Sequence, residues 1–274
     1  MPTKYPILLA HGIVLRDIRV FRRSVRRRGV SGIRVFRAFG NIEHDLRTAG
    51  YTVSTATSDG LGRIETNASQ LKRQILHILA VTGAKKINII AHSKGGLDTR
   101  YMLEHLGMRD KVASVTFICT PHKGSQVATR IDALPLPIKR GIAAYLNFWY
   151  RRFGDEAPDA LNVCRELTYT EEGVLRTADD HGVMMQSYSS VMRRMRDDPV
   201  MAIPLRISKQ NGSEESDGLV SVESGKYGDY RGNCTDGSVS HAEIVDFPLT
   251  RKKKKAEIYA FYRNLCKDLG ERGF

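Results

Sequence analysis

The sequence predicts an α/β protein with a mainly parallel central sheet and helices on both faces of that sheet. Short apolar runs indicate buried strands, and amphipathic stretches indicate helices. The two kinds of segment alternate along the first half of the chain, which is typical of β-α-β units with right-handed crossovers. With 274 residues the chain can bury a full core, so a single domain over 1–274 is expected.

Each element follows from its local pattern. Strands are expected at 5–10, 51–56, 87–90, 112–119, 182–188 and 203–208, and helices at 41–49, 64–82, 97–106 and 254–269. The basic segment 14–40 is expected to be irregular. Between 127 and 178 the strand rhythm stops, and Pro135 and Pro137 interrupt the chain. This segment is predicted to be a lid or cap inserted after the core strands, or alternatively a packed pair of core helices.

The stretch Ala91-His92-Ser93-Lys94-Gly95 joins a predicted strand to a predicted helix. It has the small-x-Ser-x-small form of a sharp turn that lifts one hydroxyl out of a sheet, which we call the elbow. A helix N-terminus after this serine would favour an oxyanion. The alternative interpretation is a serine that caps an ordinary strand–helix junction.

A serine hydroxyl becomes a good nucleophile only with a histidine in reach and an acid that orients the histidine. Asp217 follows the predicted strand 203–208, and His241 lies in a late loop, so both suit the order serine, acid, histidine. Glu214 or Glu215 could replace Asp217. His11 and His122 also follow strands and could line the site, but their place in the chain is wrong for the base.

An oxyanion hole requires two backbone N–H donors close to the serine. The N–H of Lys94 comes directly after it, and the N–H of Ile13 lies in the loop after the first strand. Gly12 would allow a close backbone approach there. We expect the Lys94 side chain to be exposed and Asp98 to be structural.

The net charge of +13 comes from local basic runs, which solvated faces explain most simply. An anionic membrane surface or nucleic acid could also account for it, although no nucleic-acid module is recognisable. Four cysteines show no metal-like spacing. The sequence leaves open whether one disulfide, for example Cys164–Cys234, forms. No signal peptide and no transmembrane run are evident, so the location is cytoplasmic as written, or secreted if a leader was removed.

Four segments match one family in order: Tyr5-Pro6-Ile7-Leu8-Leu9-Ala10-His11-Gly12, Ala91-His92-Ser93-Lys94-Gly95-Gly96, Thr120-Pro121-His122-Lys123-Gly124-Ser125 and Ser216-Asp217-Gly218-Leu219-Val220. They resemble the bacterial triacylglycerol lipases of the Pseudomonas/Burkholderia type, which are α/β-hydrolases. The resemblance implies that Ser93 is the nucleophile, Asp217 the acid and His241 the base. It also implies oxyanion donors at Ile13 and Lys94, and a helical lid at 127–178.

The resemblance further implies a serine carboxylic-ester hydrolase that forms an acyl-enzyme, acts on ester or lipid substrates, makes transient contact with a lipid interface and does not bind nucleic acid. An acyltransferase, a polyester depolymerase and a non-catalytic basic surface-binding protein of the same fold are the alternatives. No cofactor is required for the chemistry. Relatives hold a structural calcium ion, for which Asp198 and Glu243 are the matching positions, although the family has Asp where this chain has Glu243.

Overall fold

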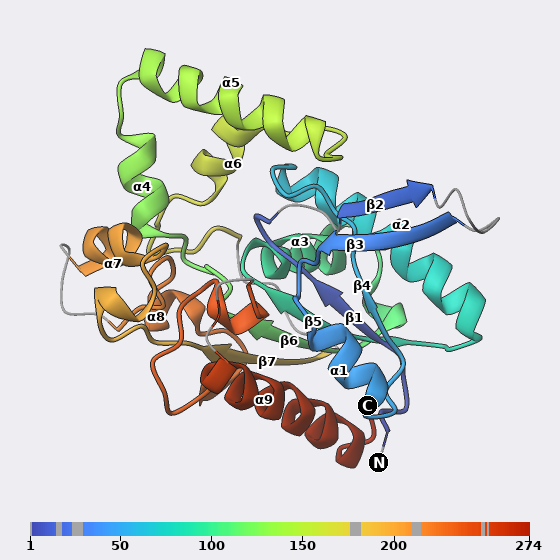
Figure 1. The fold of residues 1–274 in the computed structure, drawn as a ribbon. Helices are drawn as coiled ribbons and strands as arrows, with labels where there is room; N and C mark the ends of the chain where they lie inside the picture. The colour runs from blue at the N-terminus through green and yellow to red at the C-terminus, as the bar shows by residue number, and fades with distance from the viewer. Residues whose placement is uncertain are drawn as a thin grey trace.

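A six-stranded parallel sheet forms the centre of the molecule (Figure 1). The computed structural model describes residues 2–14, 18–23, 30–175, 182–209, 215–247, 250 and 252–274. The strands, in sheet order, are β4 (Val53–Thr55), β1 (Ile7–Ala10), β5 (Ile87–His92), β6 (Val112–Ile118), β7 (Met184–Ser189) and β8 (Asp229–Asn233). Every neighbouring pair in this sheet is parallel, which confirms the predicted fold class.

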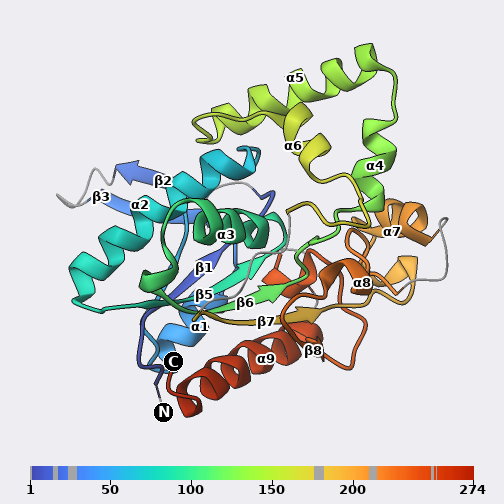
Figure 2. The same ribbon diagram turned by 180° about the vertical axis from the view of Figure 1, so that it is seen from behind.

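Helices cover both faces of the sheet (Figures 1 and 2). One layer contains α1 (Ile42–Thr48) and α9 (Lys252–Glu271), and the other contains α2 (Ile64–Thr82) and α3 (Lys94–His105). Alternate residues of β1 divide between two cores, since Ile7 and Leu9 pack with the first layer and Leu8 and Ala10 with the second. Successive side chains of a strand point to opposite faces, so a doubly covered strand must be apolar throughout.

The first turn of α3 packs tightly against the carboxyl ends of two strands. A Cβ on Gly95 would lie 2.6 Å from the carbonyl oxygen of His11, just after β1. A Cβ on Gly96 would lie 2.1 Å from Oγ1 of Thr120, just after β6. Only glycine fits at these two positions, and their close contacts fix the helix start relative to the sheet.

A helical insertion lies beyond the carboxyl edge of the sheet (Figure 1). It contains α4 (Gln126–Asp132), α5 (Leu136–Arg152) and α6 (Ala160–Glu166). Its inner side packs on the starts of α2 and α3 through two apolar clusters. The first cluster contains Leu61, Ala143 and Ala160. The second contains Ile64, Leu97, Ala128, Val163 and Leu167. The insertion therefore covers the edge where the elbow lies, and its role as a lid stays a prediction.

The sequence interpretation was wrong for two segments. Residues 203–208 belong to a helix, α7 (Ala202–Lys209), because Leu205 and Ser208 are buried at helical spacing while Ile203 is 73% exposed. The segment 14–40 is not irregular throughout, since β2 (Ile18–Arg23) and β3 (Val30–Phe36) form an antiparallel hairpin. The remaining elements are α8 (Val222–Gly225) and three 3₁₀ turns at Arg109–Lys111, Met195–Asp197 and Glu243–Val245. Among the described helices, none has the length and apolar character needed to span a membrane.

Candidate active site

Ser93 stands between the end of β5 and the start of α3. Its φ of 56° and ψ of −135° are rare for a residue with a side chain, and its N–H donates to the carbonyl of Ile118 at 3.0 Å. Such a strained strand-to-helix turn lifts the hydroxyl out of the sheet. The elbow predicted from the sequence therefore has the expected backbone shape.

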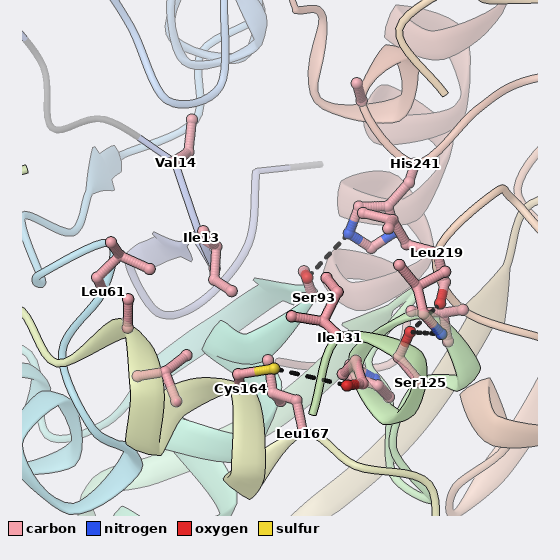
Figure 3. Close-up of a pocket in the computed structure, with 18 of the residues that line it drawn as sticks. Ile13, Val14, Leu61, Ser93, Ser125, Ile131, Cys164, Leu167, Leu219 and His241 are labelled. Carbon is pink, nitrogen blue, oxygen red and sulfur yellow. Dashed lines mark hydrogen bonds between the residues drawn. The ribbon is translucent and has the colours of Figure 1, made fainter. Parts of the chain in front are cut away.

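Hydrogen bonds connect Ser93 to His241 and His241 to Asp217. Figure 3 shows the first of the two, between Ser93 and His241. Nδ1 of His241 lies 2.6 Å from Oδ2 of Asp217, and Nε2 of His241 lies 2.9 Å from Oγ of Ser93. An ionised carboxylate only accepts hydrogen bonds, so Nδ1 carries the proton and Nε2 is free to accept from the serine. This tautomer is the one that a general base requires.

Asp217 is held by its own loop. Its Oδ1 accepts the N–H groups of Leu219 at 2.9 Å and Val220 at 2.8 Å, and its carbonyl accepts the N–H of His241 at 2.9 Å. The strand expected before Asp217 is the helix α7, so the loop follows that helix, and the last preceding strand is β7. Glu215 is exposed, and Glu214 lies outside the described residues. Asp217 is therefore the acid that the geometry selects.

The two expected oxyanion donors lie beside the serine. Lys94 is the first residue of α3, so its N–H has no acceptor within the helix. A Cβ on Gly12 would lie 2.8 Å from N of Lys94 and 3.0 Å from Oγ of Ser93. The backbone before Ile13 therefore approaches Ser93 closely, and the absent side chain of Gly12 leaves room there for a substrate oxygen.

The expected exposure of the Lys94 side chain is wrong. It is fully buried, and its Nζ lies 2.7 Å from Oδ1 of Asp98, which is also fully buried. Burial raises the pKa of Asp98 to about 6, against the opposing attraction of Lys94. The i, i+4 spacing of Lys94 and Asp98 in the sequence was a signal for this pair.

A largely apolar cavity of about 380 Å³ opens beside the Ser93 hydroxyl (Figure 3). Ser93 and His241 lie at one side of it, and Ile131, Cys164 and Leu167 from the insertion line another. The cavity falls within the size range of small-molecule sites. An extended apolar group can therefore lie next to the hydroxyl.

Solved structures with the same architecture are esterases and lipases. A metagenomic carboxyl esterase superposes with a TM-score of 0.66 at 12% identity, over 96% of this chain and 76% of its own. The mature lipase of Bacillus licheniformis superposes with a TM-score of 0.58 at 17% identity, over 93% of this chain and 92% of its own. The chain has the α/β-hydrolase fold.

Curated proteins similar to this chain are named triacylglycerol lipases, in agreement with the sequence resemblance. Triacylglycerol lipase 2 of Saccharomyces cerevisiae is 26% identical over 260 residues, covering 84% of this chain and 72% of that protein. The triacylglycerol lipase of Burkholderia plantarii is 34% identical over 181 residues, covering 61% of this chain and 45% of that protein. That of Vibrio cholerae is 37% identical over 126 residues, covering 46% and 35%. No family model matches the chain.

Two buried residues, His92 and Cys119, lie close to Asp217 and His241, and the sequence had suggested no role in the site for either of them. The ring of His92 lies 4.5 Å from the ring of His241, and burial, with His241 beside it, holds the pKa of His92 well below its usual value. Cys119, at the end of β6, has a φ of 50°. Its Sγ lies within 4.8 Å of a carboxylate oxygen of Asp217 and of a ring nitrogen of His241. All four cysteines are free thiols.

His122 does not line the cavity beside Ser93, whereas His11 does. The His122 ring is buried, stacks on Tyr227 at 4.6 Å and meets the edge of Phe117. Its Nδ1 accepts a hydrogen bond from Arg100 at 3.3 Å, and Arg100 is paired with Glu104 at 3.3 Å. Burial first, and the Arg100 guanidinium second, hold the pKa of His122 well below its usual value.

This histidine predicts a loss of stability in acid. Unfolded His122 takes up a proton as the pH falls through about 6.5, whereas the folded side chain stays neutral, so protonation favours the unfolded state. The loss reaches at most about 1.4 kcal/mol per pH unit for one histidine. The raised pKa of Asp98 has the opposite effect, because protonation of this carboxyl below about pH 6 stabilises the folded state.

Urea unfolding at pH 7.5 and pH 5.5 tests the role of His122. The difference in unfolding free energy between the two pH values should be smaller in His122→Gln than in wild type. Equal differences would contradict the assignment of the acid sensitivity to His122.

The contacts of Asp198 and Glu243 do not favour a divalent cation. Both carboxylates contact Ser240, since Asp198 Oδ2 lies 2.5 Å from its Oγ and Glu243 Oε2 lies 3.0 Å from its N. However, Nζ of Lys254 lies 2.5 Å from Oε2 of Glu243, so an ammonium group already supplies the positive charge. Two backbone N–H groups donate to the other Asp198 oxygen. The calcium ion expected from the resemblance stays a prediction that this donor set does not support.

Lys254→Met is therefore expected to destabilise the protein, because it leaves the buried Glu243 carboxylate without a counter-ion. Breaking a buried pair costs about 3–5 kcal/mol, and the partial exposure of Lys254 places the expected loss at the low end. Thermal unfolding with and without EDTA completes the test. EDTA should leave the Tm unchanged, and Lys253→Met, at an exposed neighbour, serves as the control. A fall in Tm on addition of EDTA would instead support a bound calcium ion.

Proposed function

We propose that this α/β-hydrolase is a serine carboxylic-ester hydrolase of the lipase type, with Ser93, His241 and Asp217 as its catalytic triad. One observation carries the proposal: the Ser93 hydroxyl is hydrogen-bonded to His241 at the edge of an apolar cavity of about 380 Å³. The triacylglycerol lipases among the curated relatives support it. The three side chains supply the nucleophile, base and acid, so the chemistry requires no cofactor.

In this mechanism Oγ of Ser93 attacks the ester carbonyl while Nε2 of His241 takes the hydroxyl proton. Asp217 stabilises the imidazolium that forms, and its hydrogen bond to Nδ1 keeps the ring oriented. The negative oxygen of the tetrahedral intermediate accepts hydrogen bonds from the N–H groups of Ile13 and Lys94. Collapse of the intermediate expels the alcohol, which receives its proton from Nε2 of His241.

The product of this first half is an acyl-enzyme with the acyl group on Ser93. A water molecule, deprotonated by His241, then attacks the same carbonyl, and the acid leaves as Oγ recovers its proton. The alcohol and acyl groups thus leave in separate steps. An added alcohol that competes with water would reveal transfer as ester product, which separates an acyltransferase from a hydrolase.

The cavity favours apolar acyl groups. Its lining is mostly apolar, with Leu61 and Ile13 on one side and Leu167 and Ile131 of the insertion on another (Figure 3). Each buried methylene contributes about 0.8 kcal/mol, so lengthening a chain that still fits should raise kcat/KM. Acylglycerols and other esters with aliphatic acyl chains are the substrates that this cavity suits.

The test combines turnover with covalent labelling. p-Nitrophenyl esters from butyrate to palmitate should be hydrolysed, with kcat/KM rising with chain length until the cavity is full. An alkyl p-nitrophenyl phosphonate should inactivate the enzyme with one equivalent, and peptide mass spectrometry should locate the adduct on Ser93. No turnover with any ester, or an adduct on another residue, would overturn the proposal.

We further propose that the outer side of α5 contacts a lipid interface. Tyr145 is 65% and Phe148 62% exposed, and Trp149 and Ile138 lie on the same side of the helix. The ring of Trp149 contacts the rings of both Tyr145 and Phe148, and the three form an exposed aromatic cluster. Arg140, Arg151 and Arg152 are exposed on the same helix and add positive charge. Apolar and aromatic residues beside basic ones are typical of helices that lie on lipid surfaces.

Trp149, the only tryptophan in the chain, reports on this contact. Its emission should shift to the blue when vesicles containing anionic phospholipid are added, and the shift should weaken with salt. Phe148→Ser with Tyr145→Ser should reduce vesicle binding about tenfold and leave hydrolysis of a soluble short-chain ester unchanged. Val81→Ser, at a 71% exposed residue of α2, is the matched control. Unchanged vesicle binding in the double variant would contradict the interface proposal.

A further inference from the structure

A buried ion pair lies directly behind the proposed oxyanion hole. Nζ of Lys94 and Oδ1 of Asp98 are 2.7 Å apart, and neither side chain has any exposed surface. Removing two charges from water costs several kcal/mol for each ion, and apolar residues of similar volume often give equal or greater stability. Stability alone therefore gives no reason for an ion pair at this position.

The pair spans the first turn of α3, whose first residue is Lys94. The Lys94 side chain is anchored four residues further along the same helix, so the first turn is held to the second and resists unwinding. The close contacts of Gly95 and Gly96 with the ends of β1 and β6 leave the turn no room to translate. The direction of the Lys94 N–H is therefore held by the ion pair within the helix and by the contacts of Gly95 and Gly96 with the strand ends.

Further hydrogen bonds connect the pair to the base of the insertion. Nδ2 of Asn67 donates to the second oxygen of Asp98 at 3.1 Å and to the carbonyl of Asp59 at 2.7 Å. The Asp59 carboxylate accepts the N–H groups of Glu156 and Ala157, both at 2.9 Å, in the loop after α5. Asp59, Asn67 and Asp98 are all buried. The start of α3 is thus tied through α2 to the insertion.

We propose that Lys94, Asp98 and Asn67 are positioning residues that hold the Lys94 N–H ready for the oxyanion. This inference rests on the proposed function. Oxyanion donors act by being in place before charge develops, and a displacement of about 1 Å can cost on the order of 100-fold in rate. Looser packing of the first turn should therefore lower kcat and leave substrate binding in the apolar cavity nearly unchanged.

The double variant Lys94→Met/Asp98→Leu tests this by filling the same space without the hydrogen bond or the charges. It should fold, because volume-conserving apolar replacement of a buried pair is commonly tolerated. With a soluble p-nitrophenyl ester, kcat should fall at least about tenfold and KM should change less than about twofold. The affinity for an alkylboronic acid, which mimics the tetrahedral intermediate, should fall in parallel with kcat.

A conservative variant and a matched control sharpen the test. Lys94→Gln/Asp98→Asn keeps a hydrogen bond without charge and should retain more of the wild-type kcat than the apolar variant. Asn88 and Ser114 form another fully buried polar pair, 2.7 Å apart, in the early parts of β5 and β6 and away from the elbow. Asn88→Val/Ser114→Ala should change the Tm and leave kcat unchanged.

A folded Lys94→Met/Asp98→Leu variant with kcat and boronate affinity within about twofold of wild type would overturn the inference. If that variant does not fold, Asn67→Ala is the deciding variant, because it removes only one hydrogen-bonding side chain and leaves the ion pair in place. A several-fold fall in kcat at constant KM supports the positioning role, and an unchanged kcat overturns it. Failure of the proposed function is distinguishable, because wild type would then show no turnover and no phosphonate adduct on Ser93.

Discussion

Ser93→Ala is expected to lower kcat/KM for p-nitrophenyl esters by on the order of 10⁴–10⁶-fold. The substitution removes the hydroxyl oxygen that lies 2.9 Å from Nε2 of His241. Without this oxygen the proposed acyl-enzyme cannot form. The oxyanion donors and the cavity persist, and residual hydrolysis by bound water accounts for the remaining rate. The measurement is steady-state hydrolysis, with active-site titration by phosphonate in parallel.

The Ser93→Ala protein should be folded and at least as stable as wild type, since the hydroxyl makes no structural contact besides His241 in the described part of the chain. Ser54→Ala, on the edge strand β4, serves as the control and should keep full activity. Equal rates for wild type and Ser93→Ala would remove Ser93 from the mechanism. The cavity would then need another nucleophile.

Gly12→Ala is expected to lower kcat/KM by on the order of 10²–10³-fold, the loss typical of a missing oxyanion donor. The new Cβ would lie 2.7 Å from Cβ of Ser93, 2.8 Å from N of Lys94 and 3.0 Å from Oγ of Ser93. These atoms belong to the elbow, which the strands on either side hold in place. The methyl group therefore occupies the space that the substrate oxygen needs.

Two measurements separate blockage from unfolding in Gly12→Ala. Overpacking costs about 1–3 kcal/mol, so the variant should remain folded with a lower Tm. Its affinity for an alkylboronic acid should fall together with kcat. Gly141→Ala, where a Cβ would meet nothing within 4 Å, should keep the wild-type rate with a soluble ester. A fully active Gly12→Ala enzyme would place the oxyanion elsewhere.

The parts of the fold that the sequence predicted correctly are those with strong local signals. The helix over 64–82 has the predicted bounds, because an amphipathic run of that length ends at Gly83, whose φ is 70°. The buried strands β1, β5 and β6 are continuous apolar runs, which suit a sheet that is covered on both faces. In these segments local preference and tertiary packing agree.

The mispredicted segments lack such signals. In α7, Ile203, Leu205 and Ile207 alternate with other residues, so eight residues fit a strand period as well as a helix period. Only packing, which buries Leu205 and exposes Ile203, decides between them. The hairpin of β2 and β3 mixes arginines with apolar residues, and pairing between two segments is not visible in either one alone.

For the site, chain order and strand ends were enough to predict that Ser93, Asp217 and His241 would meet. The segment before Asp217 is a helix and not the expected strand. Asp217 therefore lies beside His241 as predicted, although the reason given for its position was wrong. The buried Lys94 side chain was missed because a lysine is almost never buried unless it is paired. Recognising the pair required knowing that the first turn of α3 faces the interior. The contact between His92 and His241 depends on a loop that arrives 148 residues after the elbow serine and has no local signal.

The left-handed backbone of Ser93 and Cys119 has a consequence for engineering this protein against heat. Each of the two residues holds about 1–3 kcal/mol of conformational strain, which glycine would release. A screen that rewards only heat resistance would therefore enrich glycine at position 93, and with it heat-resistant proteins that lack the proposed nucleophile. Selection for thermotolerance in this scaffold needs a simultaneous assay of turnover.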